Sequence, residues 1–198
     1  MAARDEIALG SFQVKWLFIV LLTALCVYGA LGAWQSVWFS PLHGVDLLIH
    51  ECGHLITGLL GNELVMVMGG TLAQLAMPLA FLIYFYLQGR YAGCIFSSFW
   101  LAQNFFDVAV YARDAQALAL PLISIGGDEE STIHDWQYML NHWHAISHTQ
   151  TVANVIDSLG WILLVATFVA GIALAVSHRP PVVHFTSSAA CRNFLHGQ

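Results

Sequence analysis

Apolar residues follow one another along this chain in long stretches, and polar residues interrupt them at short breaks. A helix that crosses the roughly 30 Å hydrocarbon core of a bilayer needs about 20 apolar residues. The stretches that approach this length cover residues 16–34, 42–60, 72–87, 94–120 and 152–176. The pattern therefore predicts an all-α membrane protein with about five transmembrane helices, which form a single domain over residues 1–178.

The composition supports a lipid environment. The chain is 58% hydrophobic and only 9% charged, whereas soluble domains contain about 25% charged residues. We therefore expect an integral, multi-pass protein surrounded by membrane lipid, in a bacterial inner membrane or, as the alternative, an organelle membrane. The net charge of -6 and the lack of a basic patch argue against nucleic acid as a partner.

The first apolar stretch and the basic residues bear on topology. The triplet Ala30-Leu31-Gly32 is of the small-x-small kind that signal peptidase accepts. Acidic residues offset the basic ones before this stretch, however, and the apolar run is long, so we expect a retained span and keep cleavage as the alternative. The six Lys and Arg residues divide three to three between the two sides of a five-span protein, so the positive-inside rule sets no orientation.

A short segment between the second and third stretches has a different pattern. A glycine pair, Gly69-Gly70, follows five consecutive apolar residues, which are Leu64, Val65, Met66, Val67 and Met68. This pattern predicts a short strand and a turn. Strand backbone at membrane depth must be covered by protein or line a water-filled cavity. The segment is therefore either an exposed loop or a re-entrant strand that could hold a substrate.

Residues 121–151 form the longest polar region. An acidic, turn-like run comes first, and apolar residues then recur at helical spacing from Ile133 to Ile146. This spacing predicts an amphipathic helix that lies on the membrane surface or over the site. The polar residues His134 and Asp135 favour a helix start here, with Asp135 in the first turn. We expect residues 179–198 to form a mobile tail.

The second apolar stretch contains the pattern His-Glu-x-x-His, formed by His50, Glu51 and His54. Residues four apart share one face of a helix, so both imidazoles could bind one cation, and zinc accepts such nitrogens. Zinc lowers the pKa of a bound water to about 7, and Glu51 could take that water's proton. Ionisable groups inside a membrane span are costly and usually mark a functional site. We predict a catalytic zinc site; the alternative is a hydrogen-bonded polar seam between helices.

A catalytic zinc ion usually has three protein ligands and one open position. The fourth apolar stretch offers Asp107 and Asp114. The second and fourth spans should run parallel, so positions along them can be compared. At 1.5 Å per residue, the two histidines lie about 12 to 20 Å from the start of their helix at residue 42. Counted from residue 94, Asp107 lies about 20 Å along the fourth span and Asp114 about 30 Å. Depth therefore favours Asp107 as the third ligand, with Asp114 and the loop residue His134 as alternatives.

Three further polar residues surround the predicted site. Asp46 lies one turn before His50 and could accept its second ring proton, which would fix the tautomer. The alternative is that Asp46 lies near the helix start, where acids favour the helix dipole. Gln103 and Asn104 precede Asp107 on the fourth stretch. We expect them, with Asp46, to line a polar cleft that admits water.

These residues resemble the site-2 protease family of intramembrane zinc metalloproteases. The resemblance rests on the run from His50 to His54 in a membrane helix, on Gly69-Gly70-Thr71, and on Asn104-Phe105-Phe106-Asp107 in a later helix. It implies a three-helix core, here residues 42–120, with zinc bound by two histidines and an aspartate of the third core helix. It further implies a glutamate that activates water and an edge strand that holds a transmembrane substrate unwound.

The chain also departs from this family. No proline precedes Asp107, no glycine follows it, and there is no room for a regulatory peptide-binding domain. We therefore interpret the chain as a compact, divergent member that hydrolyses peptide bonds of membrane-embedded substrates. One alternative is a divalent-metal transporter, because Gln103 to Asp107 loosely resembles a motif of zinc and iron permeases. The other is a non-catalytic relative that binds membrane partners.

Overall fold

The computed structural model describes residues 16–31, 41–120 and 133–177, and every regular element in these ranges is helical. The chain enters through an apolar helix at Trp16–Leu31. The later elements in order are α2 (Pro41–Gly58), α3 (Glu63–Leu87), α4 (Tyr91–Arg113), α5 (Asp135–His142), the 3-10 turn η2 (Ile146–His148) and α6 (Thr149–Val176). The prediction of an all-α protein is confirmed for these residues.

Two helices are long and apolar enough to cross a membrane. They are α3, with a mean hydropathy of 1.7, and the continuous segment Ile146–Val176, with a mean hydropathy of 2.5. Only 33% and 28% of their apolar windows are buried inside the protein. Since the core helices of a soluble protein bury such surface, this exposure favours a lipid environment. Helix Trp16–Leu31 is apolar but shorter.

The expected second and fourth spans form helices but do not reach the same hydropathy. Helix α2 carries the His-Glu-x-x-His residues, and α4 carries amides, an aspartate and Arg113. These polar groups lower the mean hydropathy of both helices, so the described residues contain two candidate spans rather than five.

The strand and turn expected at residues 64–70 are absent, because these residues form the first turns of α3. Asn62 caps the helix: its side-chain oxygen accepts a hydrogen bond from the backbone N–H of Val65 at 3.0 Å. Glu63 in the first turn adds a favourable interaction with the helix dipole. The prediction of a substrate-holding strand is therefore wrong.

The glycine pair serves close packing between α2 and α3 rather than a turn. A methyl group on Gly53 of α2 would overlap the backbone carbonyl of Gly69, and one on Gly69 would overlap Thr57. The two helices can approach this closely only because neither glycine has a side chain. This contact brings the α2 face with the histidines against the start of α3.

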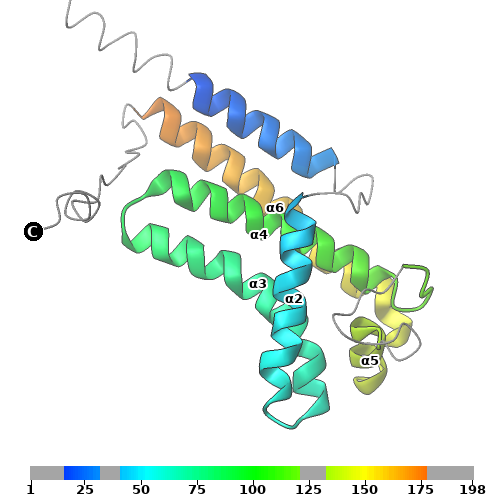
Figure 1. Ribbon diagram of the computed structural model, residues 1–198. Coiled ribbons are helices and arrows are strands. Elements are labelled where there is room, and N and C mark those ends of the chain that lie inside the picture. Colours follow the sequence, from blue (N-terminus) through cyan, green and yellow to red (C-terminus); the bar gives the residue numbers. More distant parts are fainter. Residues whose placement is uncertain (1–15, 32–40, 121–132, 178–198) are drawn as a thin grey trace, which may run out of the picture.

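Helices α4 and α6 lie side by side, and α5 lies near the end of α4 (Figure 1). One hydrophobic cluster joins the start of α3 to the end of α4, α5 and the start of α6. Its buried members are Val67, Val108, Ala112, Ala115, Trp136, Met139, Leu140 and Ala153. The amphipathic helix expected from Ile133 to Ile146 is confirmed for the shorter range of α5, whose apolar face docks on the other helices, and a turn and η2 follow it. The acidic run at 121–132 and the tail at 179–198 lie outside the described residues.

Candidate metal centre

Two imidazoles on α2 and one carboxylate on α5 converge on a common point. The rings of His50 and His54 lie edge to face, with centroids 4.7 Å apart. The Nε2 atom of His50 lies 2.8 Å from Oδ2 of Asp135, and Nε2 of His54 lies 3.2 Å from the same oxygen. The three donor atoms lie within 4.8 Å of one another. We call His50, His54 and Asp135 the candidate metal centre, or the metal centre for short.

The other nitrogen of each ring faces an oxygen acceptor. Nδ1 of His50 lies 3.1 Å from Oε1 of Gln74, and Nδ1 of His54 lies 2.9 Å from the backbone carbonyl of Met66. Since carbonyl oxygens only accept, each Nδ1 carries the proton and donates it. In a neutral ring, Nε2 then turns a lone pair toward Asp135, whereas a ring protonated on both nitrogens donates to this carboxylate. Contacts of this kind fix the tautomer and orientation of metal-binding histidines.

A cation fits the point where these lone pairs meet. At 2.8 and 3.2 Å, the two ring nitrogens and the carboxylate oxygen need a positive charge between them, which either a bound cation or a proton on Nε2 supplies. Gly70 permits this arrangement, because a Cβ atom there would lie only 2.5 Å from Nε2 of both histidines. The donor set and the missing side chain at residue 70 therefore fit a metal ion.

Asp135 is held at the start of α5 by contacts with α4. Its backbone N–H donates to the hydroxyl oxygen of Tyr111 at 3.1 Å, and the preceding residue, His134, caps the helix by accepting from the N–H of Gln137. Burial opposes the charged form of Asp135, but the two imidazoles, which donate to this carboxylate when Nε2 is protonated, outweigh it and hold the pKa of the carboxyl below its usual value. The prediction of a helix start with Asp135 in the first turn is confirmed.

The structure places Asp107 at a different point from the metal centre. Its Oδ2 lies 3.2 Å from Nδ1 of His43, two turns before His50 on α2. Helix α4 crosses α2 near the start of α2, whereas the later part of α2 lies against α3. Asp107 can therefore lie at the same depth in the membrane as His50 and His54 without contacting either of them. Asp107 is thus not near the two histidines, and Asp135 lies at the place where the third ligand was expected.

The two alternative ligands also have other roles. The carboxylate of Asp114 accepts the backbone N–H groups of Ala119 and Leu120 at 2.9 and 3.1 Å, which closes the turn after α4. His134 lies with Nε2 3.5 Å from Asp114 and its ring against Tyr111. Burial lowers the pKa of His134, although the nearby Asp114 and Asp135 favour its cation. Neither belongs to the group of three donors.

Asp46 lies in a second polar group between α2 and α4. Its Oδ1 accepts from Nε1 of Trp100 at 2.7 Å and from Nδ2 of Asn104 at 3.3 Å. Both expectations for Asp46 are therefore wrong, because Gln74 orients His50 and no acid lies in the first turn of α2. We call this group the α2–α4 polar cluster; its members are His43, Asp46, Trp100, Asn104 and Asp107.

Several buried oxygens beside this cluster have no hydrogen-bond partner among the described residues. They are Oδ2 of Asp46, Oε1 of Gln103 and Oδ1 of Asn104. Buried polar atoms are usually paired with protein or with ordered water. The cleft expected from Asp46, Gln103 and Asn104 stays a prediction, and these oxygens are where water would bind.

Glu51 lies beside the metal centre but is not one of its three possible metal ligands. Its side chain is half-buried on α2 and close enough to His54 and Tyr111 to interact with both electrostatically. A carboxylate in this position is available to accept a proton near the metal centre.

Sequence reasoning missed Gln74, Gly70 and the role of Asp135 as a donor. Asp135 stands 85 residues after His50, so no local spacing connects them. The only signal for Asp135 was an acid at the start of an amphipathic segment, next to His134. No protein-family model, curated protein or solved structure matches this chain.

Proposed function

We propose that this protein is an intramembrane zinc metalloprotease, divergent from the site-2 protease family that it resembles. One observation carries the proposal: two imidazoles direct Nε2 toward one carboxylate oxygen, while their Nδ1 atoms are held by acceptors. Two nitrogens and one carboxylate oxygen form a ligand set typical of catalytic zinc, which leaves a fourth position open.

The residues of the chain have distinct tasks in this proposal. His50, His54 and Asp135 bind the ion, and Gln74 and the Met66 carbonyl orient the rings. When bound, zinc supplies a Lewis acid and favours deprotonation of water. Glu51 accepts the proton of the attacking water and then delivers it to the leaving amine, as a general base and acid.

The membrane setting defines the class of substrate. Exposed apolar surface on α3 and α6 supports embedding in lipid, so a peptide bond that reaches the metal centre belongs to a membrane-embedded protein or peptide. A multi-pass arrangement in a bacterial inner membrane is part of this proposal. Because residues 64–68 are helical, the substrate is not held by a strand in this segment, which is a difference from the family.

Metal analysis is the first test. We expect the protein, purified in mild detergent without chelator, to hold one zinc ion per chain. Asp135→Ala should lose the zinc, whereas Asp107→Ala, the matched change in the α2–α4 polar cluster, should keep it. Full zinc occupancy in Asp135→Ala would show that the donor set is wrong.

Glu51→Gln then tests the chemistry. This variant should retain zinc but lose cleavage of transmembrane peptides in detergent, as followed by mass spectrometry, because an amide cannot accept the proton. A second candidate, a divalent-metal transporter, is favoured by the polar residues that continue along α2 toward His43 and Asp107. In that case Glu51→Gln should leave zinc flux into proteoliposomes intact. Zinc binding with neither cleavage nor flux would favour a non-catalytic relative.

A further inference from the structure

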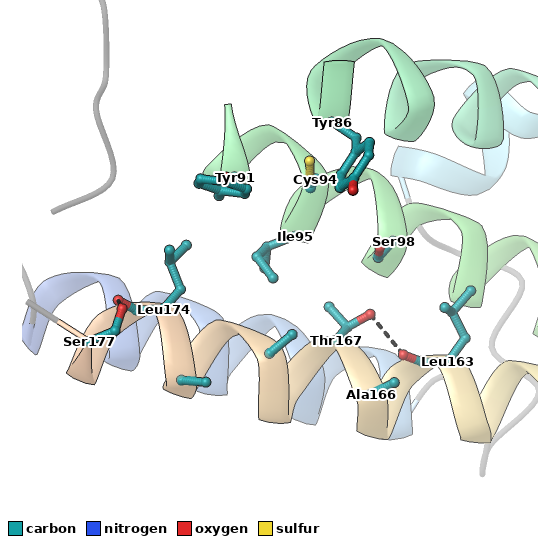
Figure 2. Close-up of a pocket in the computed structure, with 12 residues that line it drawn as sticks. Tyr86, Tyr91, Cys94, Ile95, Ser98, Leu163, Ala166, Thr167, Leu174 and Ser177 are labelled. Carbon is teal, nitrogen blue, oxygen red and sulfur yellow. Dashed lines mark hydrogen bonds between the residues drawn. The ribbon is translucent and has the colours of Figure 1, made fainter. Parts of the chain in front are cut away.

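A cavity lies between the start of α4 and the second half of α6, at the end of this helix pair away from α5 (Figure 1). Its volume is about 580 Å³, which falls within the roughly 300–1,000 Å³ of small-molecule sites. The lining comes from the end of α3, the start of α4 and the second half of α6. Figure 2 shows that the side chains of these helices face one another across an open groove.

The walls of the groove are apolar. Helix α6 contributes small residues, Ala166, Ala170 and Ala173, which leave space between the helices. The hydroxyl of Thr167 donates to the carbonyl of Leu163 at 2.7 Å (Figure 2), so it needs no partner from a ligand. An occupant of this groove is therefore held by apolar contact along most of its length.

The groove is long. Its lining on α6 runs from Leu163 to Ser177, which spans about 21 Å at 1.5 Å per residue. A hydrocarbon chain suits this elongated apolar shape, and the length exceeds the roughly 15 Å of one leaflet of a 30 Å core.

One end of the groove is polar and adjoins a cationic residue. Tyr86, Tyr91 and Ser177 line it where α3 and α6 end and α4 begins, and tyrosines at helix ends favour the membrane–water interface. Arg90 immediately precedes Tyr91 and is exposed. It is one of two Lys or Arg residues in the described ranges, in a chain whose net charge is -6. This local positive charge suits an anionic group.

We propose that this groove binds one acyl chain of an anionic phospholipid, whose headgroup lies against Arg90 and the adjacent tyrosines. The inference uses the membrane location of α3 and α6 but does not depend on zinc or on proteolysis. Lipid binding here would anchor the end of the α4–α6 pair that lies opposite the metal centre.

The test compares phosphatidylglycerol with phosphatidylcholine of the same acyl chains, titrated into detergent-purified protein and followed by native mass spectrometry. We expect one tightly bound lipid per chain and a preference for phosphatidylglycerol. Arg90→Gln should reduce that preference about fivefold, as expected for one charge near a lipid surface. Arg113→Gln, which removes the other basic residue of the described ranges, should leave the preference for phosphatidylglycerol unchanged. Equal binding of the two lipids by the wild type would overturn the headgroup assignment.

A second pair of variants tests the location. Ala170→Leu fills the groove and should abolish the bound lipid, while Val169→Leu, on the exposed face of α6, should retain it. If Ala170→Leu does not fold, the location can be tested on the wild type by crosslinking it to a phosphatidylglycerol that carries a photoreactive acyl chain. Crosslinks confined to residues 163–177 and 91–98 support the groove, and crosslinks spread evenly over all exposed helix faces, or an absence of bound lipid, overturn it. Asp135→Ala should bind the lipid normally, which separates this result from the fate of the metal centre.

Discussion

The metal centre and the α2–α4 polar cluster use similar residues on one helix but differ in what the neighbouring helix presents to them. In the polar cluster, Asp46 faces a donor, the indole N–H of Trp100. In the metal centre, His50 faces an acceptor, Oε1 of Gln74, and Gly70 leaves space beside its Nε2. The first arrangement pairs one oxygen of a carboxylate within the protein, whereas the second directs two Nε2 atoms to one shared carboxylate oxygen.

This difference shows why a group of ionisable residues in a membrane protein is not by itself a metal site. His43 and Asp107 lie as close together, at 3.2 Å, as His54 and Asp135. Among the described residues, however, only the latter group brings a third donor within 4.8 Å. The two regions therefore differ in that three possible metal-ligand atoms converge beside Gly70 in the metal centre. Substitutions can test each part of this distinction.

The largest effect is expected from filling the space at residue 70. Gly70→Ala would place a Cβ atom 2.5 Å from both Nε2 atoms. We therefore expect zinc affinity to fall by more than about 100-fold, which exceeds the loss expected when a residue that only orients a metal ligand is removed. Gly44→Ala on α2 is the control, because a Cβ there meets nothing within 4 Å. Competition with a fluorescent zinc chelator measures both, and wild-type affinity in Gly70→Ala would refute the proposed ion position.

A smaller effect is expected from removing the acceptor for His50. Gln74→Leu keeps the three donors but frees the ring of His50 to rotate, so zinc affinity should fall by about 10- to 100-fold. Gln103→Leu changes the buried glutamine beside the polar cluster and should leave zinc affinity unchanged. Equal losses in the two variants would mean that the effect is a general one on folding.

The polar cluster should respond in stability rather than in metal binding. Trp100→Phe removes the 2.7 Å hydrogen bond to Asp46, and hydrogen bonds to charged groups contribute about 1.5–3 kcal/mol. We expect the free energy of unfolding in mixed detergent to fall by about this amount, with one zinc ion still bound. Loss of zinc in this variant would show that the two regions are coupled.

The mildest perturbation removes the ion and leaves the sequence intact. Asp135 joins α5 to the histidines of α2, so a bound ion should help to hold this eight-residue helix in place. Chelation should therefore increase amide hydrogen exchange in α5 and leave exchange in α6 unchanged. Equal exchange in α5 before and after chelation would exclude Asp135 as a ligand that contributes to docking.

The sequence predicted those parts of the site that depend on local geometry. His50 and His54 share a face because a helix repeats every 3.6 residues, and Asp135 begins α5 because an acid and a capping residue favour that position. The same reasoning failed at Gly69-Gly70. The pair has the composition of a turn, but α3 continues through it because the cap at Asn62 and the packing against α2 favour a helix.

Composition and neighbours within one helical turn were enough to predict the helical class, the apolar character of the chain and two imidazoles that can act together. Packing between distant segments selected the carboxylate that lies beside these imidazoles. Asp107 and Asp135 are equally suitable as residue types, and the choice between them depends on how α4 and α5 pack around α2. That packing results from side chains distant in sequence, so no periodicity along the chain can express it.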